Sequence, residues 1–331
     1  MNRWIRWLAA LLALQLALGI ALHFSRTGLS AAPSVGAQLL SAAPDSVDAL
    51  TIEGAGGKKV ELQKKSGTWQ LPAESGFPAD ASKVRELLTH MAAVKTGTVV
   101  SNTRESQQRF KVADDIFERR VTLAAGGKTL AKLYLGDAPS PRQVHVRRDG
   151  DNAVYDVELG SWEFPADAAD WEDKGVLHVD QQDIRAIEID GLTLTRAAAA
   201  TTAAKVAKPG GTPTAPQWQT STSLKKGETL NAAAVDTLAQ RIANLDIGSV
   251  LGRADQPDYG LAKPELQFAI TRADGKRTEY RIGHMAKGQD CALKSSARDE
   301  YFQVPATTAQ GLIDAAKRDT LVQAPAGGRK K

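Results

Sequence analysis

One stretch of this chain, residues 80–100, returns in recognisable form as residues 231–251. Aligned without a gap, the two stretches share identical residues at six positions: Ala81/Ala232, Val84/Val235, Leu87/Leu238, Ala92/Ala243, Gly97/Gly248 and Val99/Val250. Both identity and spacing match, which is hard to obtain by chance. The pattern therefore predicts a duplicated unit, and a chain of 331 residues is long enough for two such units with a core each.

Within each copy the stretch has the pattern of an amphipathic helix that leads into a strand. In the first copy Asp80 is expected to cap the helix, and Gly97 to end it. Between them, apolar residues recur at helical spacing: Val84, Leu87, Leu88, Met91 and Val94. We expect this stripe to pack on a sheet, and Asn231 to cap the equivalent helix of the second copy.

Short runs of alternating apolar and polar residues predict antiparallel strands around the helix. In the first copy they lie at 49–53, 58–63, 68–71, 98–101, 119–124, 129–135, 143–147 and 153–157. Residues 161–171 are expected to form a short helix, started or interrupted at Pro165. From Ile184 the order repeats, with Trp218 in the place of Trp69 and Phe302 in the place of Tyr155. We thus predict an α+β fold of two tandem duplicated, β-rich units, at residues 45–175 and 181–321.

Residues 7–24 form an uncharged, mainly apolar run, about 27 Å long as a helix, which is close to the hydrocarbon thickness of a bilayer. A cleaved signal peptide and a retained anchor both fit such a run, and its length favours the anchor. Arg3 and Arg6 precede it, so the N-terminus is expected in the cytoplasm. We predict a single-pass inner-membrane protein with residues 1–26 as anchor, 27–44 as tether and the bulk in the periplasm.

Net charge gives no support for nucleic-acid binding. The chain has 42 basic and 38 acidic residues, and the first 26 residues hold three of the arginines and no acid. The remainder is almost neutral, and we expect no nucleic-acid partner. The only cysteine, Cys291, excludes an intramolecular disulfide and is expected to be buried in a strand.

Two segments are predicted to lie outside the packed units. Residues 197–216 form an Ala-, Thr-, Pro- and Gly-rich insertion in the second copy, and residues 322–331 form a tail that ends in three basic residues. Their composition predicts disorder. The insertion can be a tolerated surface loop or an arm that contacts a partner, and the first interpretation is favoured because long loops cost little stability.

No pattern of a catalytic, cofactor or metal site is present: the chain lacks a glycine-rich phosphate loop, HExxH and GxSxG, and its histidines have no metal-ligand spacing. We therefore predict no enzymatic activity, no cofactor and no site residues. The aromatic pairs Trp69/Trp218 and Tyr155/Phe302 are expected to be structural. Trp162 and Trp171 have no aromatic counterpart in the second copy, and either could mark an interface, although packing is favoured.

The anchor, the strand at 47–52, the Gly67–Leu71 segment and the Tyr259-Gly260-Leu261 motif with Pro264 together resemble the bacterial domain of unknown function 4340 family. The first copy departs from the motif, since Phe110-Lys111-Val112 stands in that place without the proline. The resemblance implies an envelope protein with one N-terminal anchor, often encoded beside ABC-type transporters of the kind associated with gliding machinery. It implies no catalytic residues.

Three functions remain possible from the sequence. The leading prediction is a non-enzymatic accessory or interaction component of an ABC-type transporter or another envelope complex, with a membrane partner such as a transporter permease. A second is a periplasmic ligand-binding or hydrolytic domain that acts on cell-envelope polymer. A third is a structural spacer.

Overall fold

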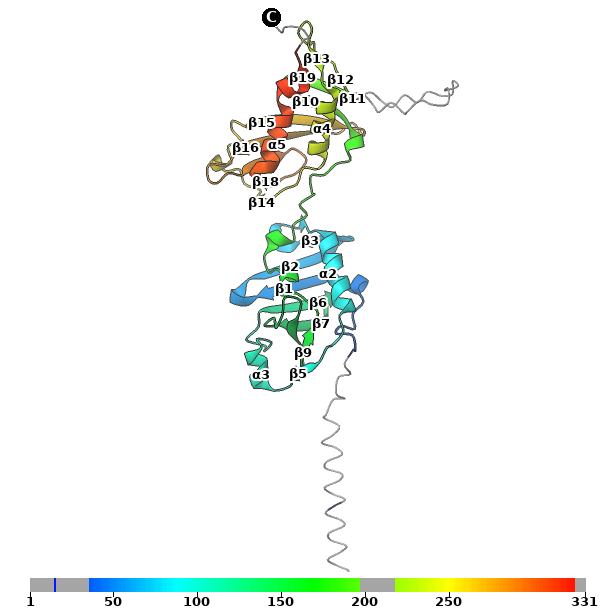
Figure 1. Cartoon of the computed structure of the whole chain (residues 1–331), viewed down its shortest axis with the longest axis vertical. Helices are drawn as coiled ribbons and strands as arrows, with labels where there is room; N and C mark the ends of the chain where they lie inside the picture. Colours follow the sequence, from blue (N-terminus) through cyan, green and yellow to red (C-terminus); the bar gives the residue numbers. More distant parts are fainter. Residues whose placement is uncertain (1–14, 16–35, 197–217, 325–331) are drawn as a thin grey trace, which may run out of the picture. The chain divides into compact units, whose positions relative to one another are not determined.

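The computed structural model describes residue 15 and residues 36–196 and 218–324, and it has an α+β fold with antiparallel sheets (Figure 1). Its contacts divide the chain into two compact units. The first comprises residues 1–67 and 82–167, and the second comprises residues 68–81 and 168–331. The mixed fold class and the antiparallel sheets agree with the sequence-based prediction.

The first sheet has nine strands in the order β4-β3-β2-β1-β6-β7-β8-β9-β5. Apolar residues alternate with polar ones along β1 and β2, as the sequence predicts, because successive side chains point to opposite faces. The strands are β1 (Ala49–Gly54), β2 (Lys59–Lys65), β3 (Thr68–Leu71), β4 (Phe77–Pro78), β5 (Val99–Ser101), β6 (Arg119–Ala125), β7 (Lys128–Leu135), β8 (Val144–Arg148) and β9 (Val154–Val157).

Helix α2 (Ala81–Ala93) belongs to the first unit, and α3 (Arg104–Arg109) follows β5. The predicted apolar stripe of α2 is buried, with Val84 and Met91 fully inaccessible to solvent. Such burial is the main source of stability for a short helix, whose intrinsic propensity is marginal. The predicted helix is therefore confirmed, but it ends at Ala93, before Val94 and Gly97.

Part of the predicted tether is in fact packed on the first unit. The backbone N–H of Leu39 donates to the carbonyl of Val94, and that of Gly36 donates to the carbonyl of Thr96. Leu39 and Leu40 are buried. The two buried leucines thus help to attach the end of this Ser-, Ala- and Gly-rich segment to the first unit. Among the described residues no helix has the length and hydropathy of a membrane span, and the predicted span at residues 7–24 lies outside them except for Gln15.

The second sheet has eight strands in the order β12-β11-β10-β15-β16-β17-β18-β14. A further pair, β13 and β19, forms a two-stranded sheet. The strands are β10 (Ile184–Ile189), β11 (Leu192–Arg196), β12 (Trp218–Thr220), β13 (Thr229–Leu230), β14 (Ser249–Gly252), β15 (Leu266–Arg272), β16 (Arg277–His284), β17 (Cys291–Ser295), β18 (Tyr301–Val304) and β19 (Val322–Gln323). Val322 and Gln323, expected in a disordered tail, therefore form a strand; residues 325–331 lie outside the described residues.

Helices α4 (Ala232–Ala243) and α5 (Ala306–Ala316) lie side by side in the second unit, followed by α6 (Arg318–Leu321) (Figure 1). The side chain of Asn231 accepts a hydrogen bond from the N–H of Ala234 at 3.2 Å, so the predicted N-cap of α4 is confirmed. The core of this unit lies between the helices and the sheet and includes Leu238, Ile242 and Phe302.

The helix expected at residues 161–171 does not form. The segment instead has two 3₁₀ turns, Ser161–Glu163 and Ala168–Asp170. Pro165 lies between them; it has no N–H to donate and disfavours the α conformation in the residue before it. Phe164 and Trp171 are nevertheless fully buried, so the segment packs without being helical.

Candidate functional site

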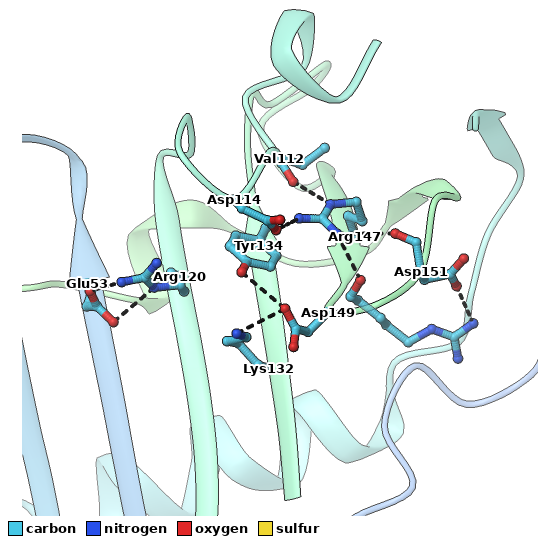
Figure 2. A network of polar contacts seen from close by, with 10 residues as sticks. Glu53, Val112, Asp114, Arg120, Lys132, Tyr134, Arg147, Asp149 and Asp151 are labelled. Carbon is cyan, nitrogen blue, oxygen red and sulfur yellow. Dashed lines mark hydrogen bonds and ion pairs between the residues drawn. The ribbon is translucent and has the colours of Figure 1, made fainter. Parts of the chain in front are cut away.

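A network of polar and charged side chains in the first unit lies across neighbouring strands of its sheet (Figure 2). Arg120 of β6 is the register partner of Tyr134 of β7, and Tyr134 is the partner of Arg147 of β8. Directly opposed residues point to the same face, so the strands themselves bring the three side chains together. Leu133 and Leu135 flank Tyr134 on β7 and point to the opposite face.

Arg147 is the centre of this network. Its side chain is only 5% exposed, and its guanidinium lies 4.3 Å from the centre of the Tyr134 ring. It donates from Nε to the carbonyl of Val112 at 2.6 Å, from Nη1 to the carbonyl of Asp151 at 3.2 Å, and from Nη2 to the carboxylate of Asp114. A buried cation with this many acceptors is well satisfied by the protein itself.

The surrounding charges are also paired. The Tyr134 hydroxyl donates to Asp149 at 3.1 Å, and Lys132 is 3.0 Å from the same carboxylate. Burial raises the pKa of the Tyr134 hydroxyl, with a further contribution from the charge of Asp114. The hydrogen bond from Arg147 lowers the pKa of the Asp114 carboxyl below its usual value. These pairings tie the loop that carries Val112 and Asp114 to the sheet, and we assign the network a structural role.

A second cation occupies the corresponding place in the second unit. Lys294 of β17 is the register partner of Tyr301, and its ammonium group lies 4.5 Å from the centre of that ring. It donates to the carbonyl oxygens of Arg298 at 2.9 Å and Asp299 at 2.6 Å. The cation therefore holds the turn between β17 and β18, much as Arg147 binds the carbonyls of the turn between β8 and β9.

The aromatic residues separate into two groups. Trp69, Trp218, Tyr155, Phe302 and Trp171 are buried, as the structural interpretation requires. Trp162 differs from all of them, because its side chain is 76% exposed. Single exposed apolar residues are common on protein surfaces. Tryptophan, however, is large and is among the residue types enriched where most of the binding energy of a protein interface arises.

The turn that presents Trp162 is held at both ends. Glu163 accepts a hydrogen bond from the N–H of Gly160 at 2.7 Å and contacts Nδ1 of His90 on α2 at 2.6 Å. The indole lies so close over Gly160 that a Cβ atom there would overlap Nε1 of Trp162. The glycine at position 160 thus lets the indole approach the backbone closely, and the contacts of Glu163 hold the turn that carries it.

The described part of the second unit contains several pockets. One has a volume of about 750 Å³ and lies where the β10–β11 turn, the start of β15 and the end of α5 meet. Another, of about 630 Å³, is lined by His284 and Cys291. Cys291 is buried in β17 as predicted, and its burial raises the pKa of the thiol.

Within residues 36–196 and 218–324, no group of three His, Cys, Asp or Glu side chains is placed to hold a metal ion. The predicted lack of a cofactor and of catalytic residues stays a prediction. The large pocket was missed from the sequence, although one signal for it was visible. Asp190-Gly191 is a tight hairpin pair, whereas the first unit has the longer Gly54–Lys58 connection after β1.

Comparison with known proteins gives one match. The family model for a domain of unknown function, DUF4340, matches residues 69–264. No curated protein and no solved structure matches the chain. The matched region covers more than half of the sequence and includes Trp69, the Tyr259-Gly260-Leu261 motif and Pro264. The chain belongs to the DUF4340 family.

Proposed function

We propose that this protein is a single-pass inner-membrane protein whose two periplasmic units bind a component of an envelope complex, such as a transporter permease, without catalysing a reaction. The observation that carries the proposal is Trp162, a large exposed indole on a turn fixed by Glu163 and Gly160. A rigid aromatic side chain loses little conformational entropy on binding, and it buries a large area when a partner covers it.

The way the chain enters the first unit supports a site near the membrane. Residues 36–39 pair with residues 94–96, directly after α2, and the contact between Glu163 and His90 is on the last turns of the same helix. Only residues 25–35 separate the apolar run from Gly36. Even fully extended, these residues span about 40 Å, so a membrane partner of the anchor lies within reach of the first unit.

We further propose that the two units arose by duplication of one ancestral unit. The strand orders β2-β1-β6-β7-β8-β9-β5 and β11-β10-β15-β16-β17-β18-β14 follow the same plan. Residues matched by sequence also have matching neighbours: Tyr155 pairs with Val146, and Phe302 pairs with Leu293. A shared register is demanding, because a slip of one residue moves every side chain to the other face.

The function is tested by isolating the full-length protein from membranes. We expect it to resist extraction by alkaline carbonate, and to be recovered after crosslinking with a membrane-protein partner. The Trp162→Ala variant should lose that partner while keeping the thermal stability of the parent, because the Trp162 side chain is 76% exposed and little of its area is buried in the folded unit. Equal recovery of the partner with parent and variant would contradict the role of Trp162.

A ligand-binding domain is the second candidate, and the 750 Å³ pocket of the second unit favours it. The third candidate, a structural spacer, has its own test. If the protein binds a partner as we propose, replacing both units by an unrelated rigid domain should abolish its cellular function. Retained function would favour the spacer.

A further inference from the structure

The large pocket of the second unit begins where one strand of its sheet stops early. Pairing between β10 and β15 ends at Ile189 and Phe268, whereas pairing between β15 and β16 continues to Leu266 and Ile282. The first residues of β15 thus have a neighbouring strand on one side only. The cause is the turn that follows Ile189.

That turn is as short as a hairpin allows. Asp190 and Gly191 both have positive φ, at +46° and +71°, and β11 begins at Leu192. Two consecutive residues with positive φ are typical of the type I′ turn, for which an Asp-Gly pair is preferred. The chain therefore reverses before it can cover the start of β15.

In the first unit the same place is filled by the chain itself. There β1 extends further, and its pairing with β6 continues to Gly54 and Arg119. A longer connection, residues 54–58, replaces the tight turn, and the Cβ of Ala166 packs against Gly54. An extended segment beside this strand position is thus compatible with the fold, and the second unit leaves room for one.

The vacant place combines an apolar wall with an acidic rim. Leu192, Leu266 and Phe268 line it and are buried, and Ile313 and Ala316 of α5 contribute from the helix layer. The remaining lining residues are mostly polar or charged: Glu188, Asp190, Thr193, Glu265, Gln267, Arg277, Glu279 and Lys317.

The charges of the rim are not balanced. Arg277 forms ion pairs with Glu188, at 2.9 Å, and with Glu279. Lys317 forms an ion pair with Asp314 at 2.7 Å. Asp190 and Glu265, by contrast, form no hydrogen bond or ion pair through their side chains within the described parts of the chain. Two free carboxylates beside an apolar wall favour a ligand that is both apolar and basic.

We propose that this pocket binds an extended, basic peptide segment of a partner protein, which lies along the start of β15 as a short added strand. Strand addition obtains affinity from main-chain hydrogen bonds and specificity from alternate side chains. One set of side chains would contact Leu192 and Leu266, and a Lys or Arg of the segment would pair with Glu265 or Asp190. The site rests on the second unit alone and not on the anchor or Trp162.

The proposal is tested with the purified full-length protein in detergent and two fluorescent probe peptides. One is acetyl-Val-Lys-Val-Ala-Lys-Val-amide, and the matched control has Glu in place of both Lys residues. We expect the basic peptide to bind at least about tenfold more tightly, since pairing with a free carboxylate typically accounts for such a factor. Glu265→Gln should weaken its binding by roughly the same factor, while Glu86→Gln, an exposed change on α2, should have no effect.

A loop graft tests the geometry. Replacing Asp190-Gly191 by the Glu53–Lys58 sequence of the first unit should fill the place and abolish binding. The thermal unfolding of the graft is measured first, and Glu265→Gln remains decisive if the graft does not fold. Equal affinity for the two peptides, or unchanged affinity in Glu265→Gln, would overturn the proposal. Tighter binding after deletion of residues 197–217 or 325–331 would show that the chain's own lysines occupy the pocket, which would also overturn it.

Discussion

Gly283 lies directly against the carbonyl oxygen of Tyr259, and a Cβ atom at position 283 would be 2.5 Å from that oxygen. In the first unit Gly136 has the same relationship to Phe110, whose carbonyl a Cβ atom would overlap. The two glycines follow Ile282 and Leu135, which occupy equivalent places in their sheets. Both units thus use a glycine to let the loop before β15, or before β6, approach the sheet closely.

We predict that Gly283→Ala destabilises the second unit by about 1 to 3 kcal/mol, because the clash involves backbone that can move only by shifting the strand or the loop. Urea unfolding followed by circular dichroism measures the change. The control is Gly275→Ala, in an open turn with φ of +79° and no atom within 4 Å of the added Cβ. It should cost about 1 kcal/mol, from backbone conformation alone. A loss for Gly283→Ala no larger than for Gly275→Ala would contradict the close approach.

Removing the buried guanidinium of Arg147 is predicted to destabilise the first unit. Arg147→Met keeps most of the apolar stem but leaves the buried carbonyl of Val112 without its donor. An unsatisfied buried acceptor costs about 1 to 3 kcal/mol, so a loss of this size is expected in the free energy of unfolding. Arg142→Met, at an exposed position, should change it by less than about 0.5 kcal/mol. Similar values for the two variants would show that the network in Figure 2 contributes little.

Acid should weaken the second unit through Glu300. Burial acts to raise its pKa, but hydrogen bonds from Arg253 and its own backbone, together with the charge and hydrogen bond of Arg298, outweigh burial, and the pKa is lowered from 4.5. The folded protein therefore holds the ionised form more tightly than the unfolded chain does. This contribution is present above the unfolded pKa and is lost as the pH falls through the folded pKa.

The measurement is the unfolding free energy of parent and Glu300→Gln from about pH 6 to about pH 3. The difference in unfolding free energy between parent and variant should be largest at the highest pH of this range and should become smaller below pH 4.5. A difference that stays constant over the whole range would contradict the lowered pKa. Glu86→Gln serves again as the exposed control.

Deleting residues 197–217 should leave the second unit intact. Arg196 and Trp218 are cross-strand partners at the base of this segment, and the guanidinium lies 5.0 Å from the indole ring centre. The carboxylate of Asp236 accepts hydrogen bonds from both side chains, from Arg196 at 2.9 Å and from Nε1 of Trp218 at 3.3 Å. An Asn-Gly turn in place of the segment is therefore expected to keep the melting temperature within a few degrees, since loop length has a small entropic cost. A large decrease would show that the segment contributes to the packed unit.

Much of the fold could be predicted from the sequence because its signals are local. The stripe from Val84 to Met91 specified α2, and the short alternating runs specified most strands. Residues 161–171 were mispredicted as helical, since burial of Phe164 and Trp171 is compatible with two 3₁₀ turns around a proline. Leu39 could not be placed either, because its partner Val94 is far away in sequence and only the folded unit brings them together.

The candidate sites were less predictable. Comparison of the two predicted copies pointed to both Trp162 and Trp171 but could not tell which is exposed, because exposure depends on the packing of the whole segment. The difference between Phe110-Lys111-Val112 and the Tyr259-Gly260-Leu261 motif can be related to backbone conformation. Lys111 has a φ of +53° and Gly260 has a φ of +68°, so both units have a residue with positive φ in this turn, and lysine is less suited to it than glycine. The Lys111 side chain forms ion pairs with Glu118 and Asp137.

Site-specific photocrosslinking in intact membranes shows whether the surface around Trp162 contacts a membrane partner, as we propose. A photoreactive phenylalanine analogue is placed at position 162 of the full-length protein, and, as a control, at position 130, where Leu130 is also exposed. We expect crosslinking to one defined membrane protein from position 162 and not from position 130. No specific product from position 162, or the same products from both positions, would contradict it.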